Sequence, residues 1–317
     1  MTGGNGFIGR KLVEVLSHQG HDVKLLSRRS DRKLPVGVQR VHGDLLSTDC
    51  PLDQLVENCE VVFHCAGEIR DESIMRSLHV DATQRLLNAV LNEAAKTGRK
   101  IHWIQLSSIG AYGPPRGRAD SDRIVTEDSK TNPVGEYETT KTLADELLIK
   151  ACQSGVMTYS IVRPSNVYGK NMPNQSLRTL GTMIGKRLFF YIGKPGAIAT
   201  YVHVDDVVEV LRRCGLDQRA RGEVINVSND CKLEDLVNGI AQALDVSYPR
   251  LRLPEYLVRA AVSVVTKFAT IPLTQERIDT LVSRTRYPCH KLEAILDYKP
   301  KIPVASSIGD ALLANPI

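Results

Sequence analysis

The chain begins with a glycine-rich turn, Thr2-Gly3-Gly4-Asn5-Gly6-Phe7-Ile8-Gly9, that runs directly into an amphipathic segment. Apolar residues recur there at helical spacing and predict a helix from Phe7 to about Gln19. Glycines three residues apart permit a tight turn, close approach of the backbone to a ligand and close packing of the helix on a sheet. The free N–H groups and the helix dipole favour a phosphate at this point. The turn therefore predicts the phosphate-binding start of an α/β unit, with a glycine turn before an ordinary helix as the alternative.

Only Met1 and Thr2 precede these glycines, although a turn of this kind follows a buried strand. In a doubly wound sheet that strand lies in the interior, and its loss would leave two neighbours with unpaired backbone groups. We therefore expect an apolar strand of about five residues to be encoded in frame upstream of Met1.

Strand and helix signals alternate over the first half of the chain. Strands are expected at 22–26, 38–41, 60–65, 101–107 and 159–163, long helices at about 73–96 and 136–154, and a loop at 165–174. Short connections between them predict a Rossmann-type doubly wound parallel sheet. We expect a dinucleotide-binding domain at 1–165, to which about 200–228 returns, and a smaller, mostly helical substrate domain within 166–317.

Composition excludes several other classes of protein. The net charge of +5 comes from dispersed basic residues, so it does not indicate a nucleic-acid partner. The seven cysteines are odd in number and show no CxxC pair, which fits reduced thiols in the cytoplasm and no metal site. The longest apolar run, Leu257–Ala269, is interrupted by Arg259 and Lys267, so no membrane span is expected. A small-molecule substrate is the expected partner.

Three polar side chains carry the expected chemistry. Ser107-Ser108 closes the strand that begins at Ile101, at the sheet edge where α/β proteins bind ligands. Tyr137 and Lys141 are spaced i, i+4, so both lie on one face of the predicted helix. A phenol has a pKa of about 10, but a cation one turn away and a positive nicotinamide ring favour the phenolate, which permits general acid–base work. Ser108 would hydrogen-bond the substrate oxygen while hydride moves to or from a nicotinamide.

With these motifs the chain resembles an extended short-chain dehydrogenase/reductase of the NAD(P)-dependent nucleotide-sugar epimerase/dehydratase family. The resemblance covers nearly the whole chain, through TGGNGFIG at 2–9, SSIGAYG at 107–113, YETTK at 137–141, RPSNVYG at 163–169 and YVHVDDV at 201–207. It implies that Ser108, Tyr137 and Lys141 are catalytic. Of the two adjacent serines, Ser108 is favoured because it lies four residues before Tyr112.

The resemblance also implies the binding residues. Lys141 would hold the nicotinamide ribose, Asp44-Leu45 would lie at the adenine, and Pro164 near the nicotinamide amide. The implied cofactor-binding residues are Gly3, Gly6, Phe7, Ile8, Gly9, Ser27, Arg28, Asp44, Leu45, Cys65, Ala66, Gly67, Tyr137, Lys141 and Pro164. The implied substrate residues are Ser108, Tyr137 and Asn166, the last at the substrate phosphates. A homodimer through the helices at 73–96 and 136–154 is also implied.

The chain departs from the family pattern at two positions. NAD-using members carry an acid at the end of the second strand, where this chain has Ser27 followed by Arg28 and Arg29. Two guanidinium groups and no carboxylate favour a 2′-phosphate, so NADP(H) is the expected cofactor and NAD(H) the alternative. His79 stands where the family often has Asn, and we expect it to be structural, as we do His203.

The favoured function is therefore 4-keto reduction or C4 epimerisation of a nucleotide-diphosphate sugar, and the arginine pair favours net reduction. A dihydroflavonol- or hydroxysteroid-type alcohol dehydrogenase is the second interpretation, because the apolar segment Leu257–Ile271 would suit an apolar pocket. A catalytically silent NADP(H)-binding sensor is the third. It would have no reason to carry Ser108, Tyr137 and Lys141 together.

Overall fold

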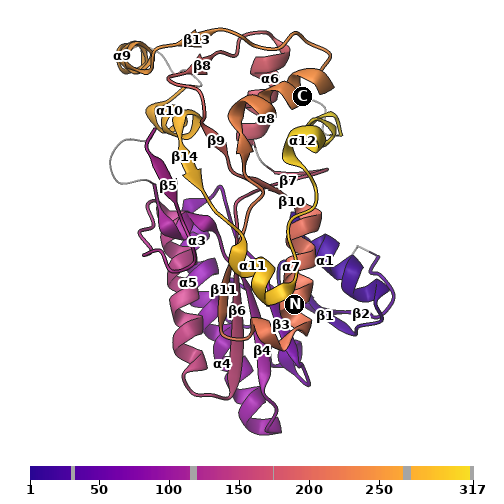
Figure 1. The fold of residues 1–317 in the computed structure, drawn as a ribbon. Helices are drawn as coiled ribbons and strands as arrows, with labels where there is room; N and C mark the ends of the chain where they lie inside the picture. Colours follow the sequence, from indigo (N-terminus) through magenta and orange to yellow (C-terminus); the bar gives the residue numbers. More distant parts are fainter. Residues whose placement is uncertain (30–32, 115–119, 174, 267–272, 315–317) are drawn as a thin grey trace.

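The computed structural model describes residues 1–29, 33–114, 120–173, 175–266 and 273–314. Its main sheet is parallel and has the strand order β11-β6-β4-β3, as Figure 1 shows. The strands are β3 (Val61–His64), β4 (Ile101–Leu106), β6 (Met157–Pro164) and β11 (Glu223–Val227). A second parallel pair, β1 (Val23–Ser27) and β2 (Val38–His42), lies beside β3. This arrangement confirms the predicted Rossmann-type fold class.

Met1 and Thr2 join these two pieces of sheet. The carbonyl of Met1 accepts a hydrogen bond from the N–H of Leu26 on β1, and the N–H of Thr2 donates to Phe63 on β3, both at 3.0 Å. The amino group of Met1 donates to Lys24 O at 2.6 Å, and burial lowers its pKa to about 6. Beyond Met1, between the same two strands, lies a cavity of about 690 Å³. The two residues thus occupy the interior strand position from which the glycine turn follows.

Helices cover both faces of the sheet. The helices α1 (Phe7–His18) and α7 (Val204–Leu216) pack on one face around a shared apolar core, in which Leu12, Leu16 and Val208 are buried. The other core contains Leu86 and Trp103 and is covered by α2 (Leu52–Val56), α4 (Ala82–Thr97) and α5 (Glu136–Cys152). Because α1 is amphipathic, burying its apolar face fixes the glycine turn against the sheet.

The long helix expected at about 73–96 is interrupted. The chain forms α3 (Glu72–Arg76), then a π-helical turn (Ser77–Asp81), then α4. His79 lies in that turn and is buried, with hydrogen bonds to both ring nitrogens. A π-turn carries one extra residue and is common at functional sites, and here it turns a polar ring inward where an uninterrupted helix was expected.

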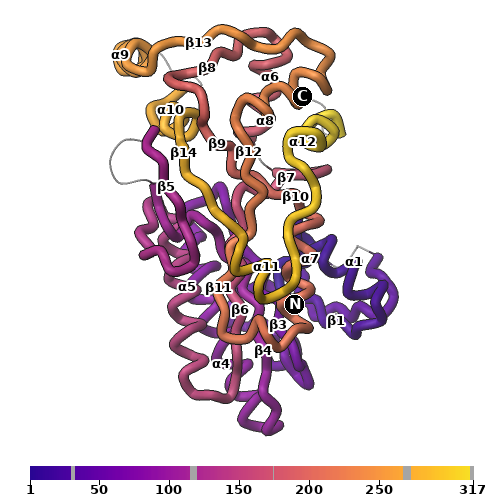
Figure 2. Tube along the Cα trace, in the orientation of Figure 1, coloured from indigo at the N-terminus to yellow at the C-terminus, as the bar shows by residue number. Residues whose placement is uncertain are grey.

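Most elements after residue 165, apart from α7, β11 and the helix at 290–296, form a second layer at one end of the molecule, shown at the top of Figures 1 and 2. The loop expected at 165–174 was partly wrong, because β7 (Asn166–Tyr168) pairs in parallel with β10 (Tyr201–His203). The remaining strands are short and lie in the pairs β5–β14, β8–β13 and β9–β12. They are β5 (Asp122–Ile124), β8 (Tyr191–Ile192), β9 (Ile198–Ala199), β12 (Cys231–Lys232), β13 (Arg252–Leu253) and β14 (Arg284–Arg286).

Helices supply most of this second layer, and a separate apolar core around Tyr168, Leu236 and Ile308 holds it together. The helices after α5, apart from α7, are α6 (Gln175–Gly185), α8 (Leu233–Ala243), α9 (Glu255–Val265), α10 (Gln275–Val282), α11 (His290–Leu296) and α12 (Val304–Leu313). The end of the predicted apolar run, 267–271, lies outside the described residues. Across the described ranges, every helix is too short or too polar to cross a bilayer.

Candidate active site

The glycine turn is packed tightly against the segment that follows β3. Gly3 has a φ of +68°, and a side chain there would overlap the backbone of Cys65. A side chain at Gly9 would overlap the carbonyl oxygen of Gly3. Gly6 is the N-cap of α1, and within the described chain no side chain caps this helix and no acid lies in its first turn. Free N–H groups in an uncapped first turn fit a bound pyrophosphate.

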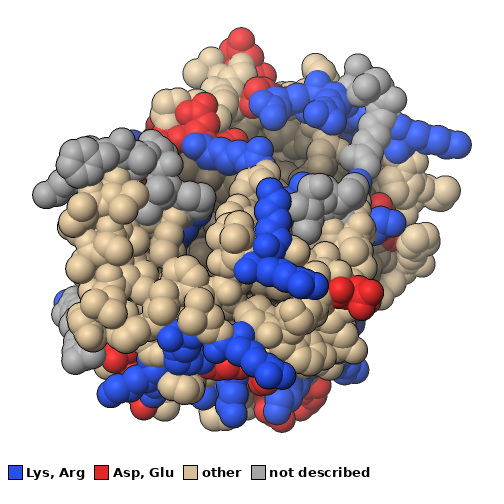
Figure 3. All heavy atoms as spheres, turned by 90° about the horizontal axis from the view of Figure 1, so that it is seen from above, with Lys and Arg blue, Asp and Glu red and all other residues tan. Residues whose placement is uncertain are grey.

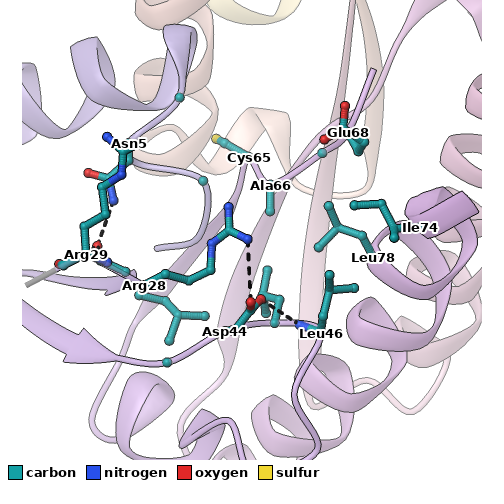
Figure 4. Close-up of a pocket in the computed structure, with 17 residues that line it drawn as sticks. Asn5, Arg28, Arg29, Asp44, Leu46, Cys65, Ala66, Glu68, Ile74 and Leu78 are labelled. Carbon is teal, nitrogen blue, oxygen red and sulfur yellow. Dashed lines mark hydrogen bonds and ion pairs between the residues drawn. The ribbon is translucent and has the colours of Figure 1, made fainter. Parts of the chain in front are cut away.

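A cavity of about 370 Å³ opens beside this turn, and Figure 4 shows its lining. Of the predicted cofactor residues, it is lined by Gly3, Gly6, Ser27, Arg28, Asp44, Leu45, Cys65, Ala66 and Gly67. Sequence reasoning missed Asn5, Leu26, Gly43, Leu46, Glu68, Ile74 and Leu78 as lining residues. Most of these adjoin predicted residues. Ile74 and Leu78 instead come from α3 and the π-helical turn, and their only sequence signal is an apolar spacing of four.

The end of β1 presents positive charge to this cavity. Arg28 is 73% exposed at its side chain, and its guanidinium lies 3.6 Å from the Asp44 carboxylate at the end of β2. The Ser27 hydroxyl is already engaged, since it accepts from Asn5 Nδ2 at 2.8 Å and donates to Arg29 O at 3.0 Å. Ser27 therefore fixes the loop, while the exposed guanidinium groups remain at the cavity mouth.

The predicted proton-handling residues come together at the carboxyl edge of the sheet. Ser108 follows β4, and its side chain lies near enough to the Tyr137 phenol of α5 to lower the pKa of that phenol. Burial, with Glu138 and Asp145 nearby, raises the pKa of Tyr137 to about 12, against the lowering effect of Ser108. The phenol is therefore protonated at neutral pH, the form that can donate a proton to a substrate oxygen.

Lys141 lies one turn beyond Tyr137 and is buried. Its ammonium donates to the carbonyl of Leu106, the last residue of β4. Burial lowers the pKa of Lys141, and the nearby Asp145 and Cys65 oppose that shift. The expected stabilisation of the phenolate by this cation does not dominate here, because burial raises the pKa of Tyr137 instead.

The other predicted contacts are spread around this edge. Pro164 ends β6 beside Val227 of β11. Asn166 is exposed, and its amide donates to Thr200 O at 3.0 Å. Phe7 packs against the cores of both layers, whereas Ile8 packs against the core shared by α1 and α7. The structure thus places these four outside the lining of the cavity in Figure 4.

His79 is bound as a neutral ring. Its Nε2 accepts from the N–H of Glu68 at 2.9 Å, so the proton is on Nδ1, which lies 2.8 Å from Thr140 Oγ1. Its ring meets Tyr137 edge-on at a centroid distance of 5.7 Å. Burial, assisted by Lys141, lowers the pKa of His79 from 6.5 to about 4. These contacts fit the structural role expected for His79.

This buried ring predicts acid sensitivity of the fold. Between pH 6.5 and about 4 the unfolded state binds a proton at His79 that the folded state does not, so stability falls as the pH falls through this window. We expect a loss of about 3 kcal/mol in the free energy of unfolding. Urea unfolding at several pH values measures it. His79→Gln should reduce the pH dependence by about that amount, whereas His290→Gln, at an exposed position, should leave it unchanged. An unchanged slope in His79→Gln would contradict the assignment.

The arrangement as a whole supports proton transfer beside a dinucleotide. An uncapped helix start, a cavity with arginines at its mouth, and a phenol, a hydroxyl and an ammonium lie along one edge of a parallel sheet. This is the edge at which α/β proteins bind nucleotides.

Comparison with known proteins agrees with this geometry. Residues 1–228 match the model of the NAD dependent epimerase/dehydratase family. The chain therefore belongs to this family of enzymes, as its motifs predict.

Individual relatives span several chemistries. The chain is 25% identical over 248 residues to UDP-N-acetyl-alpha-D-glucosaminuronate decarboxylase from Bacillus cytotoxicus, covering 73% of this chain and 74% of that protein. It is 28% identical over 269 residues to sterol demethylase protein B from Methylococcus capsulatus, covering 82% and 78%. Among solved structures, MoeE5 in complex with UDP-glucose and NAD is similar in fold, with a TM-score of 0.73 and 22% identity over 99% of this chain and 96% of that one.

Proposed function

We propose that this protein is an NADP(H)-dependent reductase or epimerase of a nucleotide-diphosphate sugar. The observation that carries the proposal is that Ser108, at the end of β4, lies beside the Tyr137 phenol, while Lys141, one turn further along α5, binds the carbonyl of Leu106 at the same strand end. The glycine turn and the cavity beside it would hold the dinucleotide, with its phosphates at the start of α1. When bound, the nicotinamide supplies or accepts a hydride.

The chain's own residues then handle the proton. In the direction of reduction, Tyr137 donates its phenolic proton to the carbonyl oxygen of the substrate, and Ser108 donates a hydrogen bond to the same oxygen. Lys141 stabilises the phenolate that remains. In the reverse direction the phenolate accepts the proton of the substrate hydroxyl. Epimerisation uses the same residues, with the sugar turned over between the two steps.

Two features support an anionic sugar nucleotide as substrate. Asn166 is an exposed residue on β7, which pairs with β10, and its amide donates to Thr200 O. Figure 3 views the second layer end-on, and blue Lys and Arg side chains lie around a hollow there. Exposed basic residues of this layer include Lys186, Arg187, Lys194 and Arg250. Positive charge around a hollow attracts a diphosphate.

A substrate screen tests the proposal. The cofactor-loaded protein is incubated with UDP- and dTDP-linked 4-keto sugars and with the corresponding hexoses. We expect NADPH consumption with a 4-keto sugar, or a change of C4 configuration without net consumption. If neither occurs while simple ketones are reduced, the nucleotide-sugar assignment is wrong.

A dihydroflavonol- or hydroxysteroid-type dehydrogenase is the second candidate. The helix α9 exposes apolar side chains, with Tyr256 at 72%, Leu257 at 51% and Val264 at 57% exposure. Apolar side chains of this kind line sites for flat hydrophobic substrates. Reduction of a steroid or flavonoid ketone, with no activity on sugar nucleotides, would favour this alternative.

The cofactor preference rests on Arg28. Its guanidinium can donate charged hydrogen bonds to a 2′-phosphate, and a hydrogen bond to a charged group contributes about 1.5–3 kcal/mol. We therefore expect Arg28→Ala to raise the Kd for NADPH roughly 10- to 100-fold and to leave that for NADH nearly unchanged. Fluorescence titration with each cofactor measures this. Arg99→Ala, at an exposed site after α4, is the matched control. An equal loss for both cofactors would refute the preference.

Two further parts of the proposal concern the protein's surroundings. We include homodimerisation through α4 and α5, and sedimentation velocity of the full chain tests it. A cytoplasmic location stays a prediction.

A further inference from the structure

A buried carboxylate lies one helical turn beyond Lys141. Asp145 is on α5, and only 1% of its side chain is exposed. Its Oδ2 accepts hydrogen bonds from Ser107 Oγ at 2.7 Å and from Nη2 and Nε of Arg163 at 3.1 and 3.3 Å. Burying a carboxylate is costly unless it is paired, so this position is tightly constrained.

These contacts are unevenly divided between the two carboxylate oxygens. Oδ2 takes all three donors, whereas Oδ1 is buried and has no hydrogen-bond partner among the described residues. Arg163, 6% exposed at its side chain, also lies over the ring of Tyr112, with its guanidinium carbon 5.0 Å from the ring centroid. Arg163 is thus held on the side of β6 by Oδ2 of Asp145 and by the ring of Tyr112.

Two residues one turn apart on α5 contact the end of β4. Lys141 binds the carbonyl of Leu106, and Asp145 binds the hydroxyl of Ser107. Ser108 follows directly, so its position relative to Tyr137 depends on both contacts. The titratable groups that face Lys141 are Asp145 on the same helix and, near β3, Cys65, His64 and His79. Arg163 on β6 faces Asp145.

We propose that Asp145 is a positioning residue for the proposed reaction: it supplies the buried counter-charge of Lys141 and, through Ser107, holds the strand end that carries Ser108. In this role Asp145 acts through these neighbours and not by contact with substrate or cofactor. Because Lys141 is buried, loss of the carboxylate leaves its ammonium with less to offset the cost of desolvation. The catalytic consequence of this role rests on the proposed function. The stabilisation of charged Lys141 by Asp145 needs no substrate and can be tested separately.

The first test measures Lys141 directly. Full-length protein with ¹³Cε-labelled lysine is titrated by NMR, and Lys141→Arg assigns the resonance. We expect Asp145→Asn to lower the pKa of Lys141 by about one unit or more. The matched control is Asp206→Asn, since Asp206 is an equally buried hydrogen-bond centre that binds Tyr298 and the N–H groups of Lys301 and Ile302. An unchanged Lys141 titration in Asp145→Asn overturns the proposal.

A double variant distinguishes a positioning role of Asp145 from a role limited to neutralising the charge of Arg163. Asp145→Asn leaves a buried guanidinium unpaired and destabilises the fold, whereas Asp145→Asn/Arg163→Met removes both charges and restores much of the stability. We expect kcat in the double variant to stay at least about tenfold below that of the unmodified protein, with the basic limb of its pH profile at lower pH. Recovery of kcat and of the Lys141 titration would show that Asp145 serves only Arg163. Absence of turnover in every form, with the Lys141 shift intact, would instead reject the proposed function and leave the electrostatic role standing.

Discussion

Tyr137→Phe is expected to lower kcat by at least about 100-fold, because the substitution removes the group that we propose exchanges a proton with the substrate oxygen beside Ser108. The phenyl ring keeps the volume of the phenol and its edge-on contact with His79, at 5.7 Å, so cofactor affinity should change little. Steady-state kinetics with the substrate found in the screen, together with NADPH titration, measures both effects.

The matched control for this variant is Tyr298→Phe. Tyr298 is also buried and hydrogen-bonded, to Asp206 at 2.6 Å, but it lies outside the site. The Tyr298→Phe variant should have a lower free energy of unfolding without a comparable loss of kcat. A kcat within threefold of the unmodified value in Tyr137→Phe would exclude the acid–base role. If the unmodified protein binds NADPH but turns over no sugar nucleotide or ketone, the third interpretation, a catalytically silent NADP(H)-binding sensor, is favoured.

Gly9→Ala is expected to have the second large effect, on cofactor binding. Its new methyl group would overlap the carbonyl oxygen of Gly3, and backbone atoms cannot rotate away as side chains do. The turn must therefore shift, and a displacement of about 1 Å at a binding site can cost roughly 100-fold in function. We expect a rise in the Kd for NADPH of about that size and a loss of about 1–3 kcal/mol in stability.

Gly185→Ala provides the comparison. Gly185 ends α6, and a methyl group there would meet Leu244 at 3.5 Å, an ordinary contact. Alanine also favours the helix, so stability should be unchanged or slightly higher. NADPH fluorescence titration and urea unfolding of both variants distinguish the cases. Unaltered NADPH binding by Gly9→Ala would show that the dinucleotide does not bind at the glycine turn.

Much of the fold was predictable because its signals are local. The helix expected from Phe7 to about Gln19 is α1, Phe7–His18, and the helix expected at 136–154 is α5, Glu136–Cys152. Apolar spacing of three and four residues specifies such elements without reference to the rest of the chain. The strand β7 was missed because three residues paired with distant β10 leave no periodic pattern.

The site was predictable to the extent that its residues share one element or follow one strand. Tyr137 and Lys141 are placed on one face by helix geometry, and Ser108 by its position after β4. Asp145 and Arg163 were missed, since a carboxylate on a helix and an arginine in a strand look like ordinary surface charges in sequence. Only their mutual burial marks them.

The sequence alone therefore determined the main strands and long helices of the first half of the chain, the glycine turn and the spacing of the phenol and the ammonium, because each depends on neighbours a few residues away. Tertiary structure decided which distant groups meet: Ser108 with Tyr137, Asp145 with Arg163, and Ile74 with the cavity beside the turn. Burial also set the proton affinities, raising the pKa of Tyr137 to about 12 and lowering that of His79 to about 4. Desolvation depends on everything packed around a group, and no local stretch of sequence contains that information.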